Sequence, residues 1–369
     1  MTATTALTAQ NTQGVSAIHH VPSDFVEKQI DACINDIGVD VVKIGMLASA
    51  RTVDAVASAL RRHGSPIIVL DPVMVSTSGA QLLPTDAIAN LRTQMLPLTT
   101  ILTPNIPEAR LLLENAGLEV PEIKTIDDVV DIAERLASLG PQCVLVKGGH
   151  LPLTKDGRIS TQEADHHTVV DVLYDSIHQT MLFETDYLPS KNTHGTGCSL
   201  ACKHRFILSL PSFPGIVSSS LPSYSPKTQS LCESILHSGL TIRVQACKRS
   251  CDPFYFPPIT SFPTHPSHSL QNHQLNSFSP TAAIACNIIR DERPVLDSVP
   301  EAVESAIRYV EAGIRTSSSL GKGNGPINHF HSMTGKSPGE AESSLRRGVY
   351  RRDKVSGSGA GREKYHVSE

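Results

Sequence analysis

The chain has 369 residues and a net charge of −4 at pH 7, enough for one large domain or two ordinary ones. Aromatic residues make up 4% of the sequence and Trp is absent, so composition and charge argue against a nucleic-acid surface. No stretch of about 18 apolar residues occurs, and the first residues lack the basic and apolar parts of a signal peptide. The eight cysteines include no pair of CxxC motifs at zinc-site spacing. We therefore expect a soluble, cytoplasmic α/β protein that binds neither nucleic acid nor a membrane.

Short apolar runs alternate with helical patterns from residue 24 to residue 175. Strands are expected at 41–44, 67–70, 101–103 and 143–146, helical faces at 53–60, 107–113 and 127–139, and a hairpin at 166–174 and 181–184. This alternation is typical of a parallel sheet that helices cover on both faces. Ligands of such sheets bind beyond the carboxyl ends of the strands, where we expect Asp71, Asn105 and Lys147.

The character of the sequence changes after residue 201. Residues 203–280 are rich in Ser, Pro and His and show no sustained period, so we assign them no regular structure. A helical pattern resumes at 282–288, and a second helix is expected over 303–314. The chain therefore divides into the first part of one domain at 1–201, a disordered insertion at 202–281, the last part of the domain at 282–331, and a disordered, charged tail at 332–369.

Residues 192–198 read N-T-H-G-T-G-C and precede an apolar run. Two glycines separated by one Thr predict a tight turn that opens a helix, whose backbone N–H groups can hold a phosphoryl oxygen. Cys198 would lie at the N-terminus of that helix, a position that lowers the pKa of a thiol. The spacing alone fits a glycine-rich turn with a buried structural Cys equally well, because short glycine motifs are weak signals.

Seven segments follow one another over residues 1–201 and 282–330; they lie at 5–12, 43–47, 71–75, 103–109, 146–150, 194–198 and 321–330. In this order they resemble the hydroxymethylpyrimidine/phosphomethylpyrimidine kinases of thiamine biosynthesis, in the ribokinase-like superfamily. The resemblance implies a three-layer α/β/α fold with a mainly parallel central sheet. It also implies ATP- and Mg²⁺-dependent phosphorylation of hydroxymethylpyrimidine, and then of its monophosphate to the diphosphate.

The resemblance further implies a metal and nucleotide site. Asn105 and Glu108 match the family's Asn-x-x-Glu motif, which holds Mg²⁺ and its waters; as an alternative, the same pair is a helix cap and an acidic first-turn residue. Asp71 would lie near the magnesium and the phosphates, or it only caps the next turn. The residues that would contact ATP are Lys147, Gly148 and Gly149, although Lys-Gly-Gly after a strand is by itself usually a turn.

Substrate and chemistry are assigned by the same resemblance. Gln10 would bind the ring nitrogens and amino group of the pyrimidine, while Met46 and Val75 would pack against the ring. In the alternative, Gln10 is a solvated polar side chain and the other two are core residues. Cys198 would accept the proton of the substrate hydroxyl, or it is buried and inert. The anion hole would be formed by Gly195, Thr196 and Gly197.

The sequence departs from the family pattern at two places. The family begins with a strand, a glycine-rich loop and a helix that this sequence lacks, and their loss would expose two ladder edges. Residues 202–281 interrupt the helix behind the expected anion hole. Because Cys202-Lys203 can be encoded TGT-AAG, which contains GTAAG, we interpret this stretch as a retained intron, with a genuine insertion as the alternative.

Two further functions stay open on the sequence. A pyridoxine or pyridoxal kinase would share the fold and the Gly-Thr-Gly-Cys turn. A non-catalytic fragment that retains the nucleotide site would fit the two departures, and the sequence does not decide whether the chain is active. The family suggests a homodimer. A dinucleotide-dependent oxidoreductase is disfavoured, because no GxGxxG follows the first expected strand.

Overall fold

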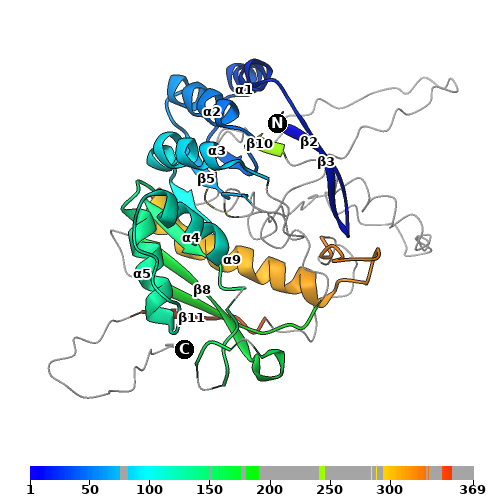
Figure 1. Cartoon of the computed structure of the whole chain (residues 1–369), viewed down its shortest axis with the longest axis vertical. Coiled ribbons are helices and arrows are strands. Elements are labelled where there is room, and N and C mark those ends of the chain that lie inside the picture. The colour runs from blue at the N-terminus through cyan, green and yellow to red at the C-terminus, as the bar shows by residue number, and fades with distance from the viewer. Residues whose placement is uncertain are drawn as a thin grey trace, which may run out of the picture.

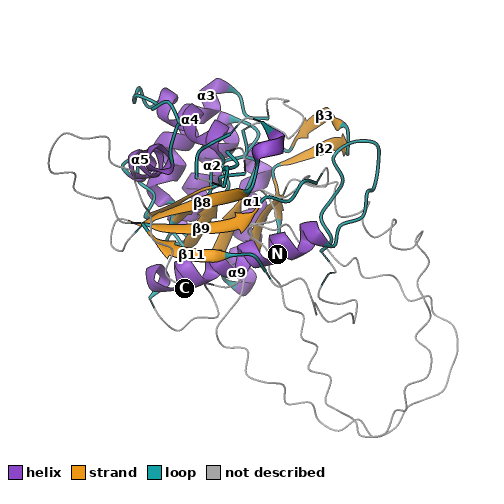
Figure 2. Ribbon diagram, turned by 90° about the horizontal axis from the view of Figure 1, so that it is seen from below, coloured by secondary structure: helices purple, strands orange, loops and turns teal. Residues whose placement is uncertain are grey.

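The computed structural model describes residues 1–74, 82–149, 151–155, 157–160, 162–175, 180–190, 241–245, 284, 288, 294–329, 331 and 343–350. These residues form an α/β protein around a nine-stranded sheet of order β1-β10-β4-β5-β6-β7-β8-β9-β11. Helices α2 to α5 lie on one side of this sheet and α9 lies on the other (Figure 2). The predicted three-layer α/β/α fold is confirmed.

The strands and helices have the following bounds. The strands are β1 (Ala3–Thr4), β2 (Ala6–Asn11), β3 (Gly14–His20), β4 (Val41–Ile44), β5 (Ile67–Leu70), β6 (Ile101–Leu102), β7 (Cys143–Val146), β8 (Thr168–Asp175), β9 (Met181–Asp186), β10 (Thr241–Gln245) and β11 (Arg346–Val349). The helices are α1 (Ser23–Ile37), α2 (Ala50–Arg62), α3 (Thr85–Asn90), which continues as η1 (Leu91–Met95) and η2 (Leu96–Leu98), α4 (Ile106–Asn115), α5 (Ile126–Ala137), η3 (Glu163–Asp165) and α9 (Val295–Arg315).

Strands β4 to β7 pair in parallel and form the centre of the sheet. Because successive side chains of a strand point to opposite faces, each strand supplies both cores. In β4, Val42 and Ile44 pack into the core beneath α1 to α5, whereas Val41 packs into the core beneath α9. Burial on both faces explains why these strands are almost continuously apolar in sequence. Among the described residues, no helix has both the length and the apolar character needed to cross a membrane.

Strand β10 falls within residues 202–281, for which the sequence analysis expects no regular structure. It pairs antiparallel with β4 on one side and with β1 on the other. It therefore covers the edge of β4, the strand at the end of the parallel group. An unpaired strand edge tends to recruit other strands, which gives this position a physical reason to be filled.

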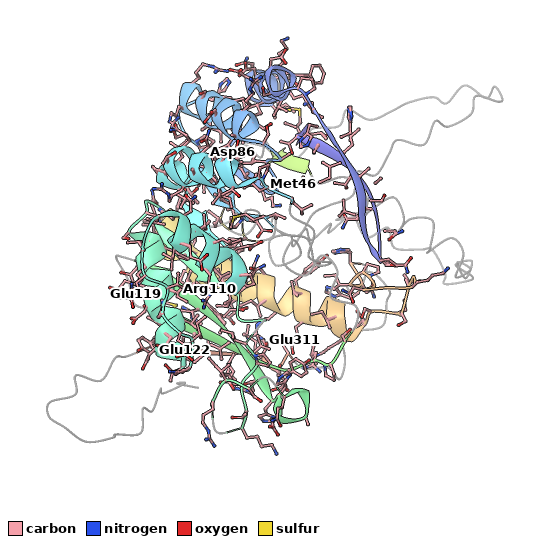
Figure 3. The ribbon with its side chains drawn as sticks, in the orientation of Figure 1. Met46, Asp86, Arg110, Glu119, Glu122 and Glu311 are labelled. Carbon is pink, nitrogen blue, oxygen red and sulfur yellow. The ribbon has the colours of Figure 1, made fainter. Side chains whose placement is uncertain are left out.

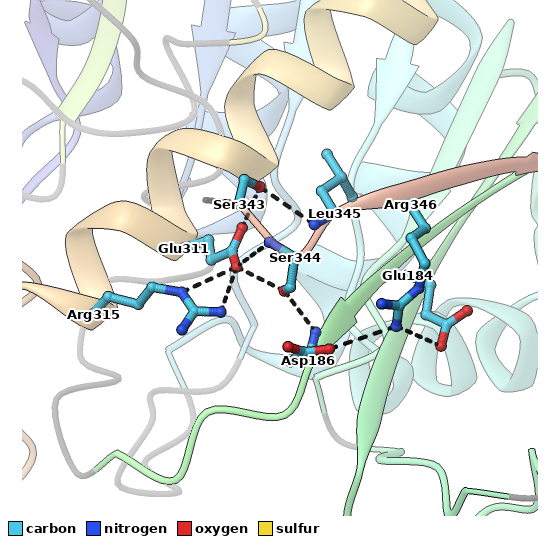
Figure 4. A network of polar contacts seen from close by, with 8 residues as sticks. All are labelled: Glu184, Asp186, Glu311, Arg315, Ser343, Ser344, Leu345 and Arg346. Atoms are coloured by element: carbon cyan, nitrogen blue, oxygen red, sulfur yellow. Dashed lines mark hydrogen bonds and ion pairs between the residues drawn. The ribbon is translucent and has the colours of Figure 1, made fainter. Parts of the chain in front are cut away.

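Strand β11 corrects the expectation that the whole tail at 332–369 is disordered. It pairs antiparallel with β9, and the residues before it are anchored on α9 through the buried carboxylate of Glu311 (Figure 4). That carboxylate accepts hydrogen bonds from the hydroxyl groups of Ser343 and Ser344 and from the Ser344 N–H. Residues 343–349 carry no apolar period; apart from the buried Leu345, they are held by polar contacts, which a pattern of hydrophobicity does not reveal.

A second, two-stranded sheet consists of the antiparallel hairpin of β2 and β3. The base of the hairpin packs on Met46, which is 1% exposed and follows β4 (Figure 3). The Thr5 hydroxyl donates a hydrogen bond of 2.8 Å to the Met46 carbonyl. The far end of the hairpin extends toward the loop that follows α9 (Figure 1).

Candidate active site

The carboxyl ends of β5, β6 and β7 bring three predicted residues together. Asp71 directly follows β5, Asn105 lies three residues beyond β6, and Lys147 directly follows β7. Asn105 and Lys147 form a parallel bridge, and the Lys147 N–H donates to the Pro104 carbonyl at 2.8 Å. The side chains that the sequence analysis placed beyond the strands therefore meet at one edge of the sheet.

Lys147 forms the centre of the polar cluster at this edge. Its Nζ lies 2.8 Å from Oδ1 of Asp71 and 3.9 Å from Oε2 of Glu108. The side chains are 12%, 2% and 4% exposed, in that order. A buried ammonium with two carboxylates is stable only while the charges compensate each other. The cluster is therefore a preorganised charged group at the edge where ligands of such sheets bind.

Asn105 and Glu108 form a capping box at the start of α4. The Asn105 side-chain oxygen accepts from the Glu108 N–H at 2.9 Å, and Oε2 of Glu108 accepts from the Asn105 N–H at 2.8 Å. The helix-cap alternative is thus confirmed for both residues. A role in holding a metal stays a prediction, and the two roles are compatible because a carboxylate has further lone pairs.

The pKa of Glu108 is raised to about 7. Burial is the main cause and the neighbouring Asp71 adds to it, whereas Lys147 opposes the shift. An additional cation beside Glu108 would stabilise its ionised carboxylate and so lower this raised pKa.

The donor set fits a magnesium ion. Mg²⁺ prefers oxygen ligands and is commonly held by one or two carboxylates together with substrate phosphates. Asp71 and Glu108 place two carboxylates around the ammonium of Lys147, and Asn105 adjoins them through its capping box with Glu108. Within the described part of the chain, no group of three or more His, Cys, Asp or Glu residues is placed to hold a metal. Phosphate and water oxygens would therefore have to complete such a site.

Gly148 and Gly149 differ in their surroundings. A Cβ on Gly148 would lie 1.8 Å from the Val170 carbonyl oxygen of β8, so glycine is required where the chain after β7 passes close to β8. A Cβ on Gly149 would meet nothing within 4 Å. The backbone of β8 therefore explains Gly148, while Gly149 lies in a turn and faces open space.

Asp171 is a residue that the sequence analysis missed. Its Oδ1 accepts a hydrogen bond of 2.7 Å from the Gly148 N–H. Burial raises the pKa of Asp171 to about 6, although the Gly148 amide and the charge of Lys147 lower it. The signal in the sequence is a single acidic residue inside the otherwise apolar run of residues 169–173.

The predicted substrate contacts are only partly described. Met46 is buried against Ala6 and its neighbours in a small apolar core, as the core alternative predicted. Gln10 lies on β2 and is partly exposed. Val75 lies outside the described residues, and so do the predicted anion hole and base: Gly195, Thr196, Gly197 and Cys198.

Comparison with known proteins identifies the family. The sequence model of the family described as Phosphomethylpyrimidine kinase matches residues 1–203. The putative hydroxymethylpyrimidine/phosphomethylpyrimidine kinase 2 of Schizosaccharomyces pombe is 43% identical over 201 residues, which are 54% of this chain and 36% of the relative. The hydroxymethylpyrimidine/phosphomethylpyrimidine kinase of Mycobacterium tuberculosis (strain H37Rv) is 44% identical over 200 residues, 54% of this chain and 66% of the relative. The match thus spans between about a third and two thirds of these relatives.

Solved structures support the fold. The pyridoxal kinase of Staphylococcus aureus, solved in complex with pyridoxal, superposes with a TM-score of 0.58 over 95% of this chain and 87% of that one. At 18% identity, this likeness shows the shared fold alone. The family match covers more than half of the chain, and it includes the cluster of Asp71, Glu108 and Lys147. On this basis the chain belongs to the phosphomethylpyrimidine kinase family.

Proposed function

We propose that this chain transfers the γ-phosphoryl group of ATP to the hydroxymethyl group of hydroxymethylpyrimidine, and then phosphorylates the monophosphate. The observation that carries the proposal is the buried ammonium of Lys147 between Asp71 and Glu108, at the edge of the sheet where ligands bind. The substrate comes from the names of relatives that are 37% to 44% identical. ATP is supported by related folds solved with ADP and with AMP-PCP.

Phosphoryl transfer depends on positioning and charge neutralisation more than on covalent chemistry. Lys147 would place a fixed positive charge near the phosphates, and Asp71 and Glu108 hold that ammonium in place. Asn105, Glu108 and Asp71 would hold Mg²⁺, which supplies further neutralisation of the phosphate charge when it is bound. Gly149 leaves room for a phosphate oxygen to approach the backbone.

The hydroxyl proton needs an acceptor. Cys198 as a thiolate would take it, while the substrate oxygen bonds to the γ-phosphorus and the bond from that phosphorus to the β,γ-bridging oxygen breaks. ADP then leaves with the bridging oxygen. The N–H groups of residues 195–197 would hold the charge that develops on the transferred phosphoryl group.

Release of ADP by the purified full chain tests the proposal, with hydroxymethylpyrimidine and pyridoxal as separate substrates. We expect turnover of the pyrimidine, and a loss of about 100-fold or more in kcat for Lys147→Met. Lys155→Met is the matched control, because Lys155 is exposed in the loop beyond the cluster. Thermal unfolding of each variant separates lost chemistry from lost folding. Preferential turnover of pyridoxal would reject the substrate, and no turnover of either would reject the activity.

A further inference from the structure

The tip of the β2–β3 hairpin is held by a glycine-rich loop from the other end of the domain. The N–H groups of Lys322 and Gly323 each donate to Thr12 Oγ1 at 3.2 Å. The Asn324 N–H donates to the Thr12 carbonyl at 3.0 Å. Lys322 and Thr12 are 310 positions apart in sequence. We call residues 321–324 together with Thr12 the hairpin clasp.

Two glycines of the clasp are required by this contact. A Cβ on Gly323 would lie 2.1 Å from the Thr12 carbonyl oxygen, and one on Gly321 would lie 2.4 Å from Thr12 Oγ1. Gly321 also has a φ of +81°, which favours glycine. The clasp thus accounts for two glycines, Gly321 and Gly323, of a motif that the phosphoryl-transfer site leaves without a role.

The loop that contains residues 321–324 packs on α9. The Asn328 N–H donates to the Gly313 carbonyl at 2.9 Å. The side chain of Ile327 is 3% exposed and packs against Gly313. Helix α9 in turn packs on the central sheet. The other end of the hairpin is fixed by the contact of Thr5 with Met46. The hairpin is therefore held at its base by the segment after β4 and at its tip by the loop after α9; Figure 1 shows its path between the two.

Gln10 lies between these two supports. It is two residues from Thr12 on β2, and the pairing of β2 with β3 shifts between Ala9 and Gln10. Such a bulge changes the direction of the side chains beside it. The clasp holds the chain two residues beyond this shift, where the ladder itself is locally disrupted.

We propose that Thr12 and the clasp position Gln10 for binding the pyrimidine ring. Thr12 is then a positioning residue, which acts through Gln10 and has no contact with ATP. The inference rests on the proposed function for the identity of the ligand that Gln10 meets. It predicts that opening the clasp weakens binding of the pyrimidine and leaves binding of the nucleotide unchanged.

Binding and hydrogen exchange of the full chain test this inference. Thr12→Val removes the hydroxyl acceptor and keeps the shape, whereas Thr12→Ser keeps the acceptor. We expect Thr12→Val to raise the Kd for hydroxymethylpyrimidine about fivefold, because it removes the acceptor of both hydrogen bonds to Thr12 Oγ1, with the Kd for ATP within about twofold. Calorimetric titration gives both constants without turnover. Exchange of the amides of residues 322–324 should become faster in Thr12→Val and stay slow in Thr12→Ser.

Gly321→Ala provides a second way to open the clasp, and Gly64→Ala is its control. Gly64 has nearly the same φ, +80°, but a Cβ there meets nothing within 4 Å. Only Gly321→Ala should weaken pyrimidine binding. Unchanged exchange in Thr12→Val, an equal change in both Kd values, or a wild-type chain that binds no pyrimidine would each overturn the inference. A wild-type chain that binds both ligands without turnover would reject the proposed function alone.

Discussion

The carboxylate of Asp171 joins the end of β7 to the middle of β8 through the Gly148 N–H. Its pKa is raised to about 6 from an ordinary value of 3.8, with burial as the main cause. The folded protein therefore binds this proton more tightly than the unfolded chain does. The contribution of Asp171 to stability therefore falls as the pH rises from about 4 to about 6, because the unfolded chain loses the proton first.

Asp171→Asn removes this titration and tests it. The free energy of unfolding of the wild type should fall between pH 4 and 6 relative to the variant, on the order of 1 kcal/mol after allowance for partial exposure. Urea unfolding at a series of pH values measures the difference. Asp165→Asn is the matched control, because Asp165 is an exposed residue just before β8. Parallel pH curves for wild type and Asp171→Asn would contradict the assignment.

Gly148 and Gly149 provide a matched pair of adjacent positions. Gly148→Ala should lower the free energy of unfolding by about 3 kcal/mol, because its Cβ would collide with the backbone of β8. Gly149→Ala should change it by less than about 0.5 kcal/mol, since the space around it is open. If Gly149 lies against ATP as proposed, its variant should raise the KM for ATP. Denaturant unfolding and initial rates test both residues, and equal stability losses would refute the distinction.

Single residues were predictable from sequence where they follow a strand. Asp71, Asn105 and Lys147 were placed correctly, because the carboxyl ends of parallel strands share one edge. Asp171 was missed, because it lies inside a strand and its partner is a backbone amide. The local sequence also did not decide whether Met46 is a core residue or a ligand contact, because its burial depends on packing against the β2–β3 hairpin.

Helix α9 and strand β11 meet through one buried acid. Burial raises the pKa of Glu311, but the hydrogen bonds from Ser343 and Ser344 and from Arg315 lower it by more, so the net shift is downward. On the exposed side of the same contact, Arg347 lies 3.3 Å from Glu301. The strand is therefore attached by one buried anchor and by exposed ion pairs.

The two kinds of anchor should differ in strength. Glu311→Gln should lower the free energy of unfolding by about 2 kcal/mol, the usual value for hydrogen bonds to a charged group. Glu301→Gln should cost less than about 0.5 kcal/mol, because exposed ion pairs contribute little. Urea unfolding gives both values, and amide exchange in residues 346–349 should become faster only in Glu311→Gln. Equal costs would mean that burial of this acid contributes nothing to the attachment.

Among the elements, those with an apolar period were predicted and those held by polar contacts were not. Strands β5 and β7 carry continuous apolar runs, and the run of β4 is interrupted only by Lys43, so their existence followed from the sequence alone. Strand β11 reads R-R-G-V and has no such pattern. Its position follows from Glu311 on α9, which is remote in sequence and becomes a neighbour only in the folded chain.

The sheet of the whole molecule is completed by β10, the described part of residues 202–281. Deletion of residues 202–281 would remove β10 from the edge of β4 and would leave β1 without its partner. We expect this deletion to lower Tm by about 5 °C or more and to promote aggregation, because an open strand edge recruits other chains. Differential scanning calorimetry and light scattering measure the two effects.

A second deletion variant, with a strand of the family type added before residue 1, separates two interpretations. If residues 202–281 are a retained intron, this repaired chain should be at least as stable as the full chain and more active. A full chain that exceeds the repaired chain in both respects would favour a genuine insertion.

The three-layer fold was predictable because apolar strands alternate with amphipathic helices. The position of β10 was not, because a Ser- and Pro-rich stretch gives no pairing signal.

The hairpin clasp also has a consequence for synthesis on the ribosome. Thr12 leaves the exit tunnel 310 residues before Lys322, whereas the N–H groups that hold it belong to residues 322–324. During most of translation the hairpin is therefore without its support, and its exposed edges are open to other nascent chains. Completion of the clasp marks the point at which the first and the last parts of the domain depend on each other.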